Sequence, residues 1–150
     1  MTVRLAQRKD RDRVVELGKL MHKESPVYSK YPYDDEKVRS WIEEHGVNPS
    51  KLFLVSEVND EIVGFFFARM GTHFFSPEKM AIDECLYLHP DHRGGREVFR
   101  MFHEYENWGR FHGAKVINFS QTVLGFDERW VKFCKKLGFH LTGSSFKKEI

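Results

Sequence analysis

The stretch IDECLYLHPDHRGGREVFRMFHEYENWG, residues 82–109, decides the fold. Apolar residues end a strand at Leu88, a polar turn with two glycines follows, and a helix then begins at Arg96. Apolar side chains recur along this helix at spacings of three and four residues, which is typical of a helix packed on a sheet. Gly113 ends the helix. The stretch therefore predicts a strand, a glycine turn and a helix in direct succession.

Strand and helix patterns continue on either side of this unit. Aspartates at positions 10, 34 or 35, and 127 are placed to cap helices. The expected strands span residues 3–7, 52–58, 62–70, 80–88, 114–121 and 139–147, the last divisible at Gly143, and the expected helices span 10–24, 34–46, 96–112 and 127–137. This order predicts one α+β (mixed α/β) domain over residues 1–150.

Composition excludes several classes of protein. The 150 residues are 41% hydrophobic and carry a net charge of only +2, which argues against a disordered chain and against a nucleic-acid binder. The longest apolar stretch, residues 62–68, is far shorter than the roughly 20 residues that span a bilayer, and the N-terminus is charged too early for a secretory signal. Cys85 and Cys134 are expected to be free thiols in a reducing cytosol. We therefore expect a cytoplasmic protein without membrane or nucleic-acid partners.

The glycine turn before the third helix has the chemistry of a phosphate site. A helix N-terminus exposes unpaired N–H groups and a partial positive charge, and glycines let a phosphate approach them closely. Gly94 and Gly95 supply that turn, and Arg93, Arg96 and Arg100 flank it with guanidinium groups that can bind phosphate. The alternative is an ordinary glycine turn with solvated arginines.

The order of these elements and their motifs resembles the GNAT superfamily, the Gcn5-related N-acetyltransferases. Residues 86–96, LYLHPDHRGGR, are similar to the family's strand ending before proline and its glycine loop, and residues 134–139, CKKLGF, to the end of its last helix. Residues 24–28, 33–37 and 143–148 look like small GNATs that tailed phages and their hosts often carry. The resemblance covers nearly the whole chain.

This resemblance implies a fold and a cofactor. The fold is a twisted, mostly antiparallel central sheet of six to seven strands with about four helices. The cofactor is acetyl-CoA, held by its pantetheine arm along one strand and by its pyrophosphate at the glycine loop. The implied cofactor-binding residues are Leu86, Tyr87, Leu88, Arg93, Gly94, Gly95 and Arg96. The implied reaction is transfer of the acetyl group to a primary amine, by direct attack in a ternary complex.

A base is useful in that reaction because the attacking amine must be neutral. A lysine-like amine with a pKa of ~10.4 costs about 4–5 kcal/mol to deprotonate at pH 7. Glu84 is the carboxylate best placed on the strand before the acyl site, and burial among apolar neighbours helps a carboxylate to accept a proton. Asp83 is the second candidate; it points to the opposite face of a regular strand, although GNATs commonly carry a bulge here. Either residue could instead lie in solvent or pair with an arginine.

Three positions depart from the family pattern. The loop has Arg96 where a glycine is expected and Val98 where glycine or alanine is expected, while the Gly94–Gly95 pair supplies flexibility earlier. Cys134 stands where many members have a tyrosine that protonates the departing thiolate. A thiol could transfer that proton, and the alternative is a buried structural cysteine.

Aromatic residues outside the helices have two interpretations. Tyr28, Tyr31 and Tyr33 lie where GNATs build one wall of the acceptor pocket, and Phe74 and Phe75 could form the opposite wall. Equally, these rings could pin loops onto the core. No metal site is expected, because His89 and His92 have no third ligand near them in the sequence.

The sequence thus predicts an N-acetyltransferase that is a monomer or homodimer, with a small-molecule amine or a protein lysine or N-terminus as acceptor. The alternative is a GNAT-fold module without catalysis that binds coenzyme A or a partner protein. The changed loop and the missing tyrosine motivate this alternative.

Overall fold

The computed structural model describes residues 2–120, 128–143 and 148 of the chain. The strands are β1 (Thr2–Leu5), β2 (Lys51–Val58), β3 (Glu61–Thr72), β4 (Lys79–Leu88) and β5 (Val116–Asn118). The helices are α1 (Arg11–Glu24), α2 (Asp35–Val47), α3 (Glu97–Phe111) and α4 (Glu128–Lys136), with short 3-10 turns at Arg8–Asp10, Tyr28–Lys30 and Pro90–His92. Every helix and strand expected before residue 119 is present, with ends shifted by a few residues.

The sheet has the order β1-β2-β3-β4-β5 and is antiparallel except between β4 and β5. This confirms the mixed α/β class and the mostly antiparallel sheet. The described residues contain five strands rather than the six to seven expected. Residues 139–143 form no strand, and the N–H of Phe139 bonds the Cys134 carbonyl at the end of α4. Residues 144–147 of the expected last strand and the expected cap Asp127 lie outside the described residues.

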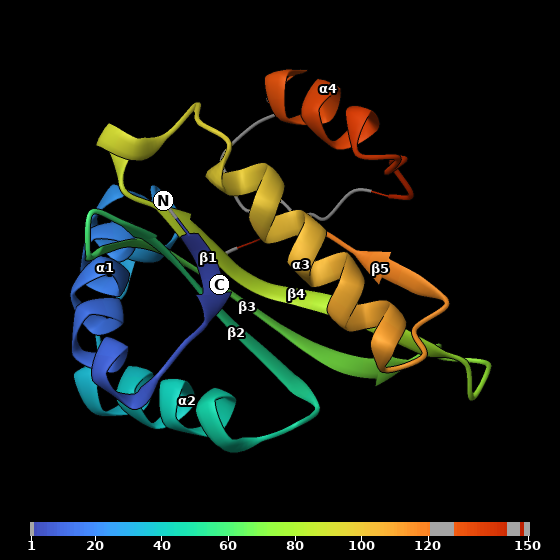
Figure 1. The fold of residues 1–150 in the computed structure, drawn as a ribbon, viewed down its shortest axis with the longest axis horizontal. Helices are drawn as coiled ribbons and strands as arrows, with labels where there is room; N and C mark the ends of the chain where they lie inside the picture. Colours follow the sequence, from blue (N-terminus) through green and yellow to red (C-terminus); the bar gives the residue numbers. More distant parts are fainter. Residues whose placement is uncertain (1, 121–127, 144–147, 149–150) are drawn as a thin grey trace.

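Helices cover both faces of the sheet, with α1 and α2 on one face and α3 on the other (Figure 1). Side chains of β2 and β3 alternate between the two faces, as the period of a strand requires. Phe53, Val55, Phe65 and Phe67 pack with α1 and α2, whereas Leu52, Leu54, Phe66 and Ala68 pack with α3. None of the described helices has the length and hydrophobicity to cross a membrane.

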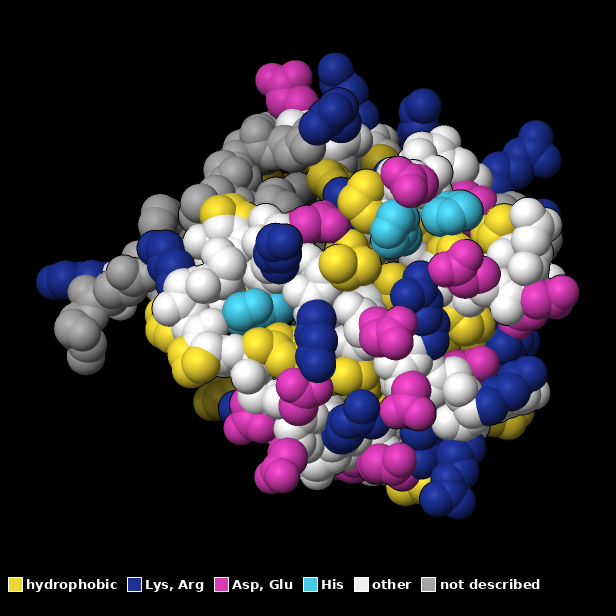
Figure 2. Space-filling view, turned by 90° about the vertical axis from the view of Figure 1, so that its left-hand side faces the viewer, with side chains coloured by type: hydrophobic (Ala, Val, Ile, Leu, Met, Phe, Trp, Pro, Cys, Tyr) yellow, Lys and Arg dark blue, Asp and Glu magenta, His cyan; other side chains and the backbone are white. Residues whose placement is uncertain are grey.

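The outer surface of α1 and α2 carries charges of both signs (Figure 2). Several of them pair between the two helices: Lys19 with Asp35 at 2.8 Å, Arg39 with Asp12 at 2.6 Å, and Arg11 with Glu43. Such exposed pairs contribute little to stability individually. They leave this face without one dominant sign of charge.

A β-bulge interrupts the pairing of β3 with β4. Phe67 pairs with Cys85 and the next residue, Ala68, pairs with Asp83, so Glu84 is the extra residue. Without the bulge, Glu84 would pair with Ala68 and face α3. The bulge therefore places Glu84 on the α1–α2 side of the sheet and Asp83 on the α3 side.

Candidate active site

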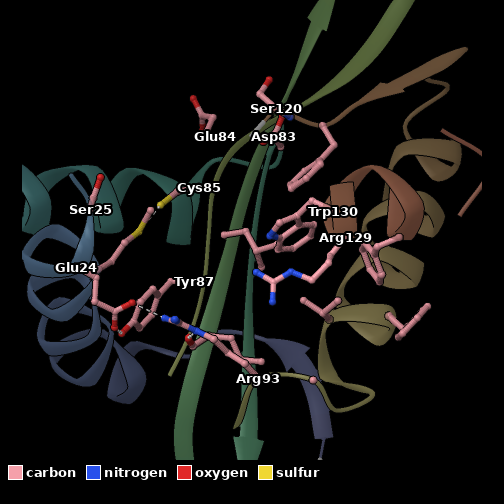
Figure 3. Close-up of a pocket in the computed structure, with 18 of the residues that line it drawn as sticks. Glu24, Ser25, Asp83, Glu84, Cys85, Tyr87, Arg93, Ser120, Arg129 and Trp130 are labelled. Carbon is pink, nitrogen blue, oxygen red and sulfur yellow. Dashed lines mark hydrogen bonds and ion pairs between the residues drawn. The ribbon is translucent and has the colours of Figure 1, made fainter. Parts of the chain in front are cut away.

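A cleft of about 590 Å³ lies beside the second half of β4 (Figure 3). It is bounded by the end of α1, the glycine loop, α3 and α4. Its lining residues are Met21, Glu24, Ser25, Pro26, Tyr28, Asp83, Glu84, Cys85, Leu86, Tyr87, Leu88, Arg93, Gly94, Gly95, Val98, Phe99, Phe119, Ser120, Arg129, Trp130 and Phe133. Residues distant in the sequence thus meet around one strand.

The cleft opens because β4 and β5 separate. They pair only over Met80–Ile82 of β4, and beyond that point two side chains take the backbone groups that pairing would have used. The Tyr105 hydroxyl donates to the Asn118 carbonyl at 2.8 Å, and Asp83 Oδ1 accepts from the Ser120 N–H at 2.9 Å. The backbone edge of β4 after Ile82 consequently faces the cleft.

The glycine loop leads into α3 at the end of this edge. Gly94 has φ +87, a conformation that favours glycine, and no atom lies within 4 Å of the position that a Cβ would take. At Gly95 a Cβ would collide with the carboxylate of Glu97, the buried first residue of α3. Arg96 is the N-cap residue but does not line the cleft. The loop therefore leaves open space in front of the α3 N-terminus.

Arg93 is held by α1 and by β4. Its guanidinium donates to Glu24 at 2.6 Å and to the Leu88 carbonyl at 2.8 Å, and lies 5.4 Å from the centre of the Tyr87 ring. The Tyr87 hydroxyl also donates to Glu24, at 2.7 Å. Burial acts to raise the pKa of Glu24, but the hydrogen bonds from Arg93 and Tyr87 outweigh it and keep this pKa below its usual value. Burial and the bond to Glu24 raise the pKa of Tyr87.

The two candidate bases both line the cleft but lie on either side of β4 (Figure 3). Burial raises the pKa of Asp83 to about 6, although its hydrogen bond from Ser120 acts in the opposite direction. Glu84 contacts Nε2 of His45 through one carboxylate oxygen and lies 3.4 Å from Nε of Arg69 through the other. The two carboxylates therefore have different partners despite being adjacent in the chain.

The remaining predicted residues are divided between the cleft and other places. Leu86, Tyr87, Leu88 and Tyr28 line the cleft. Tyr31 and Tyr33 do not; the Tyr33 hydroxyl donates to the Val15 carbonyl at 3.3 Å and fixes the loop to α1. Phe74 and Phe75 are 91% and 94% exposed in the β3–β4 connection, so the structure does not bring them to this cleft.

Cys134 lies on α4, half-buried, and does not line the cleft, although the preceding residue Phe133 does. Burial raises the pKa of the Cys134 thiol. Cys85 does line the cleft, but its sulfur packs 3.4 Å from the sulfur of Met21 and burial raises its pKa to about 12. Neither thiol has the lowered pKa of a reactive cysteine.

Sequence reasoning missed several residues of the site. Arg129 and Trp130 reach the cleft from the first turn of α4, where Figure 3 shows the Arg129 guanidinium inside it. The spacing of Trp130 and Phe133 marks the inward face of α4 and could have indicated this. Glu24 and His45 carried no local signal, because their partners are 69 and 39 residues away in the chain.

The sequence matches the acetyltransferase (GNAT) family over residues 16–139. The chain belongs to this family. GNAT proteins use acetyl-CoA as the cofactor, as the resemblance implied. A search of curated proteins gives no match.

Solved structures of GNAT proteins share the fold over almost their whole length. AAC(6')-Iy with the bisubstrate analogue CoA-S-monomethyl-acetylneamine is 14% identical, with a TM-score of 0.80 over 99% of this chain and 97% of the other. A predicted acetyltransferase with acetyl-CoA from Clostridium acetobutylicum is 17% identical (TM-score 0.77; 99% and 95% covered). Glucosamine-6-phosphate N-acetyltransferase from Arabidopsis thaliana is 18% identical (TM-score 0.74; 99% and 97% covered). At these identities the similarity shows the fold alone.

The residues present fit acetyl-CoA. An elongated thioester needs an open strand edge, and β4 offers one beyond Ile82. A pyrophosphate needs unhindered N–H groups, and the space at Gly94 lies in front of a 15-residue helix. Among the described residues, no cluster of three or more His, Cys, Asp or Glu side chains could hold a metal ion.

Proposed function

We propose that this GNAT protein is an N-acetyltransferase that acetylates a primary amine by direct attack within a ternary complex. The observation that carries the proposal is the cleft in which an open strand edge, a glycine loop and two carboxylates meet. When bound, acetyl-CoA supplies the acetyl thioester. Leu86, Tyr87 and Leu88 are proposed to hold its pantetheine arm, and Arg93, Gly94 and Gly95 its pyrophosphate. Arg96, which does not line the cleft, is left out of this set.

Glu84 is proposed as the base. Its side chain is 21% exposed at the bulge, so it can reach the cleft while part of it is shielded from water. Asp83 is the second candidate, since a carboxyl group whose pKa is raised to about 6 accepts a proton readily near neutral pH. Asp83 already accepts a hydrogen bond from the Ser120 N–H, and this bond helps to keep β4 and β5 apart. Glu84 is therefore preferred.

The strand itself is proposed to stabilise the developing negative charge. A backbone N–H on the edge of β4 that β5 does not pair is the proposed donor, and a fixed donor of this kind is worth about 2.7–4 kcal/mol in acyl transfer. For the proton that the leaving thiolate requires, the candidates are Cys134 and water. The position of Cys134 outside the cleft lining favours water. A covalent acetyl-cysteine is disfavoured by the packing of Cys85 on Met21.

A cationic acceptor suits this cleft. Asp83 and Glu84 line it, and carboxylates attract an ammonium group before it loses its proton, whereas Glu24 is already paired with Arg93. Two similar structures have a bisubstrate analogue with acetylneamine and glucosamine-6-phosphate in their names. We propose an amine on a small polar molecule as acceptor, with a protein lysine or N-terminus as the alternative.

Calorimetric titration with acetyl-CoA tests the cofactor site. We expect micromolar binding by the wild type and none by Gly94→Glu, because a carboxylate would occupy the open space at the loop. Gly138→Glu is the matched control: Gly138 also has a positive φ, +84, and open space, but it lies after α4. Loss of binding in both variants, or no binding by the wild type, would contradict the assignment of the loop.

Thiol release during an amine screen tests the reaction. Release that depends on both acetyl-CoA and an amine supports the acetyltransferase. Binding of acetyl-CoA without release for any small amine or protein substrate would favour the alternative, a non-catalytic module. The specific observation behind that alternative is that Arg93 is already bound by Glu24.

A further inference from the structure

His45 on α2 is completely buried on the α1–α2 face of the sheet. Its side chain has no exposed surface. The ring packs against Trp41 (4.4 Å between ring centres) and Phe67 (4.9 Å). A polar ring in such surroundings must have hydrogen-bond partners for its nitrogens, or its burial is costly.

Each ring nitrogen of His45 has one partner. Nδ1 lies 2.8 Å from the Trp41 carbonyl oxygen, and Nε2 contacts a carboxylate oxygen of Glu84. A carbonyl oxygen only accepts, so Nδ1 carries a hydrogen. In a neutral imidazole Nε2 then has a lone pair, and a lone pair does not bind a carboxylate oxygen. The contact therefore requires one proton between Nε2 and Glu84.

We propose that His45 is a positioning residue that acts through Glu84: in the resting protein the two side chains bind one proton between them, and His45 thereby orients the carboxylate. This inference rests on the proposed function. In the reaction an N–H bond of the amine breaks and an O–H bond forms to the Glu84 oxygen that does not contact His45. The pair then holds a second proton, which returns to water to restore the resting state.

The proton that His45 shares can exchange with solvent only through Glu84. His45 is sealed by Trp41 and Phe67, and its Nδ1 is held by a carbonyl, whereas Glu84 is 21% exposed. The Glu84 carboxylate, which faces the cleft, is thus also the group from which the proton passes to water. This arrangement lets a buried imidazole take part without touching the substrate.

The charged and titratable groups around the pair come from three elements. Arg69 on β3 approaches the other oxygen of Glu84 at 3.4 Å. Asp83 and the Cys85 thiol flank Glu84 on β4. From α1, Arg11 packs on Gly46 next to His45, but it is paired with Glu43. Among the described residues, Arg69 and the shared proton of His45 are thus the positive groups next to the carboxylate.

A direct test is NMR of the protein without ligands, with 15N-labelled histidine and 13C-labelled glutamate carboxyl groups. We expect Nδ1 of His45 to carry a hydrogen across the titration, and Nε2 and the Glu84 carboxyl resonance to change at the same pH. A hydrogen on Nε2 with none on Nδ1, or separate transitions for the two residues, would overturn the shared proton. This readout needs no catalytic activity.

The kinetic test uses two His45 variants. His45→Gln can still donate to Glu84 but cannot titrate, and His45→Phe keeps the aromatic packing but binds neither partner. We expect kcat to fall about 3- to 10-fold in the first and about 10- to 100-fold in the second, since a misplaced base costs up to about 100-fold. Both should keep the wild-type KM for acetyl-CoA and change the shape of the kcat–pH profile.

His112 supplies the matched control. Its Nδ1 also lies near the carbonyl of the tryptophan four residues earlier, Trp108, at 3.0 Å, with 4.8 Å between the rings. Within the described residues it contacts no carboxylate, so His112→Gln should leave kcat and its pH profile unchanged. Variants of His45 that match the wild-type profile would overturn the positioning role. If the wild type transfers no acetyl group to any amine, the proposed function fails, while the NMR result still decides the shared proton.

Discussion

The charged side chains on the two sides of β4 have different hydrogen-bond partners. On the α3 side, Asp83 binds the Ser120 N–H, and the loop beyond it offers bare backbone at Gly94. On the α1–α2 side, Glu84 binds a buried histidine and Glu24 binds Arg93. The bulge creates this division, because one extra residue exchanges the faces of the two adjacent carboxylates. Under the proposed function, Glu84 on the α1–α2 side accepts the proton, whereas Asp83 on the α3 side keeps β4 and β5 apart, and the Glu24–Arg93 pair belongs to the cofactor site.

The largest expected effect is on kcat. Glu84→Gln should lower it by at least ~100-fold, because a general base contributes about 10²–10⁴-fold. Asp83→Asn, its neighbour on the other side, should lower kcat less than ~10-fold. Steady-state thiol release with saturating acetyl-CoA measures both. If Asp83→Asn is the more damaging, the division between the two sides of β4 is reversed.

The next effect is on stability and concerns Asp83. Its pKa is raised from 3.8 to about 6, so the folded protein binds this proton more readily than the unfolded chain. The resulting stabilisation is fully present below about pH 3.8 and is lost as the pH rises through about 6. A shift of about two units corresponds to about 3 kcal/mol, which partial exposure reduces to about 2 kcal/mol. Urea unfolding at pH 4 and pH 7 should show this decrease for the wild type and not for Asp83→Asn.

If Asp83→Asn loses as much stability as the wild type between pH 4 and pH 7, another group causes the decrease. Glu24 cannot be its source, since its pKa is lowered and its contribution has the opposite sign. Its stabilisation is present above the ordinary range of a glutamate and is lost as the pH falls through the folded pKa. Comparing Glu24→Gln with the wild type over the same pH range separates the two carboxylates.

The third prediction concerns the affinity for acetyl-CoA and the Glu24–Arg93 pair at the end of β4. Arg93→Ala should weaken acetyl-CoA binding about 10-fold by removing a charge-assisted phosphate contact. Glu24→Gln should strengthen it severalfold, because the Arg93 guanidinium no longer has a competing carboxylate. Arg110→Ala is the control, since Arg110 forms a surface pair with Glu106 at 2.6 Å. Weaker binding in Glu24→Gln would mean that Glu24 positions Arg93 rather than competing for it.

Local sequence patterns predicted most of the fold and one end of the site. The glycine loop, the strand before it and the helix after it all follow from residues 82–109, because turn chemistry and periodicity are local properties. The partners of the carboxylates were not predictable in this way. His45 meets Glu84 only because α2 packs over a bulge in β4, and neither the bulge position nor that packing is encoded by spacing within one element.

The aromatic residues illustrate the same limit. Tyr28, Tyr31 and Tyr33 carry similar side chains within six positions, yet only Tyr28 lines the cleft. Tyr33 is held by the Val15 carbonyl, a contact that depends on how the loop crosses α1. Expectations for the acceptor pocket therefore depended on loop conformation, which varies more than the strands and helices that carry it.

The smallest expected effect concerns Cys134, on the α3 side of the sheet. Cys134→Ala should change kcat less than ~3-fold, because the thiol does not line the cleft and burial raises its pKa. Water in the cleft can protonate the leaving thiolate equally well. The solvent isotope effect on kcat, measured for the variant and the wild type, should also be the same. A loss above ~10-fold with a changed isotope effect would make Cys134 the proton donor and place proton handling on both sides of β4.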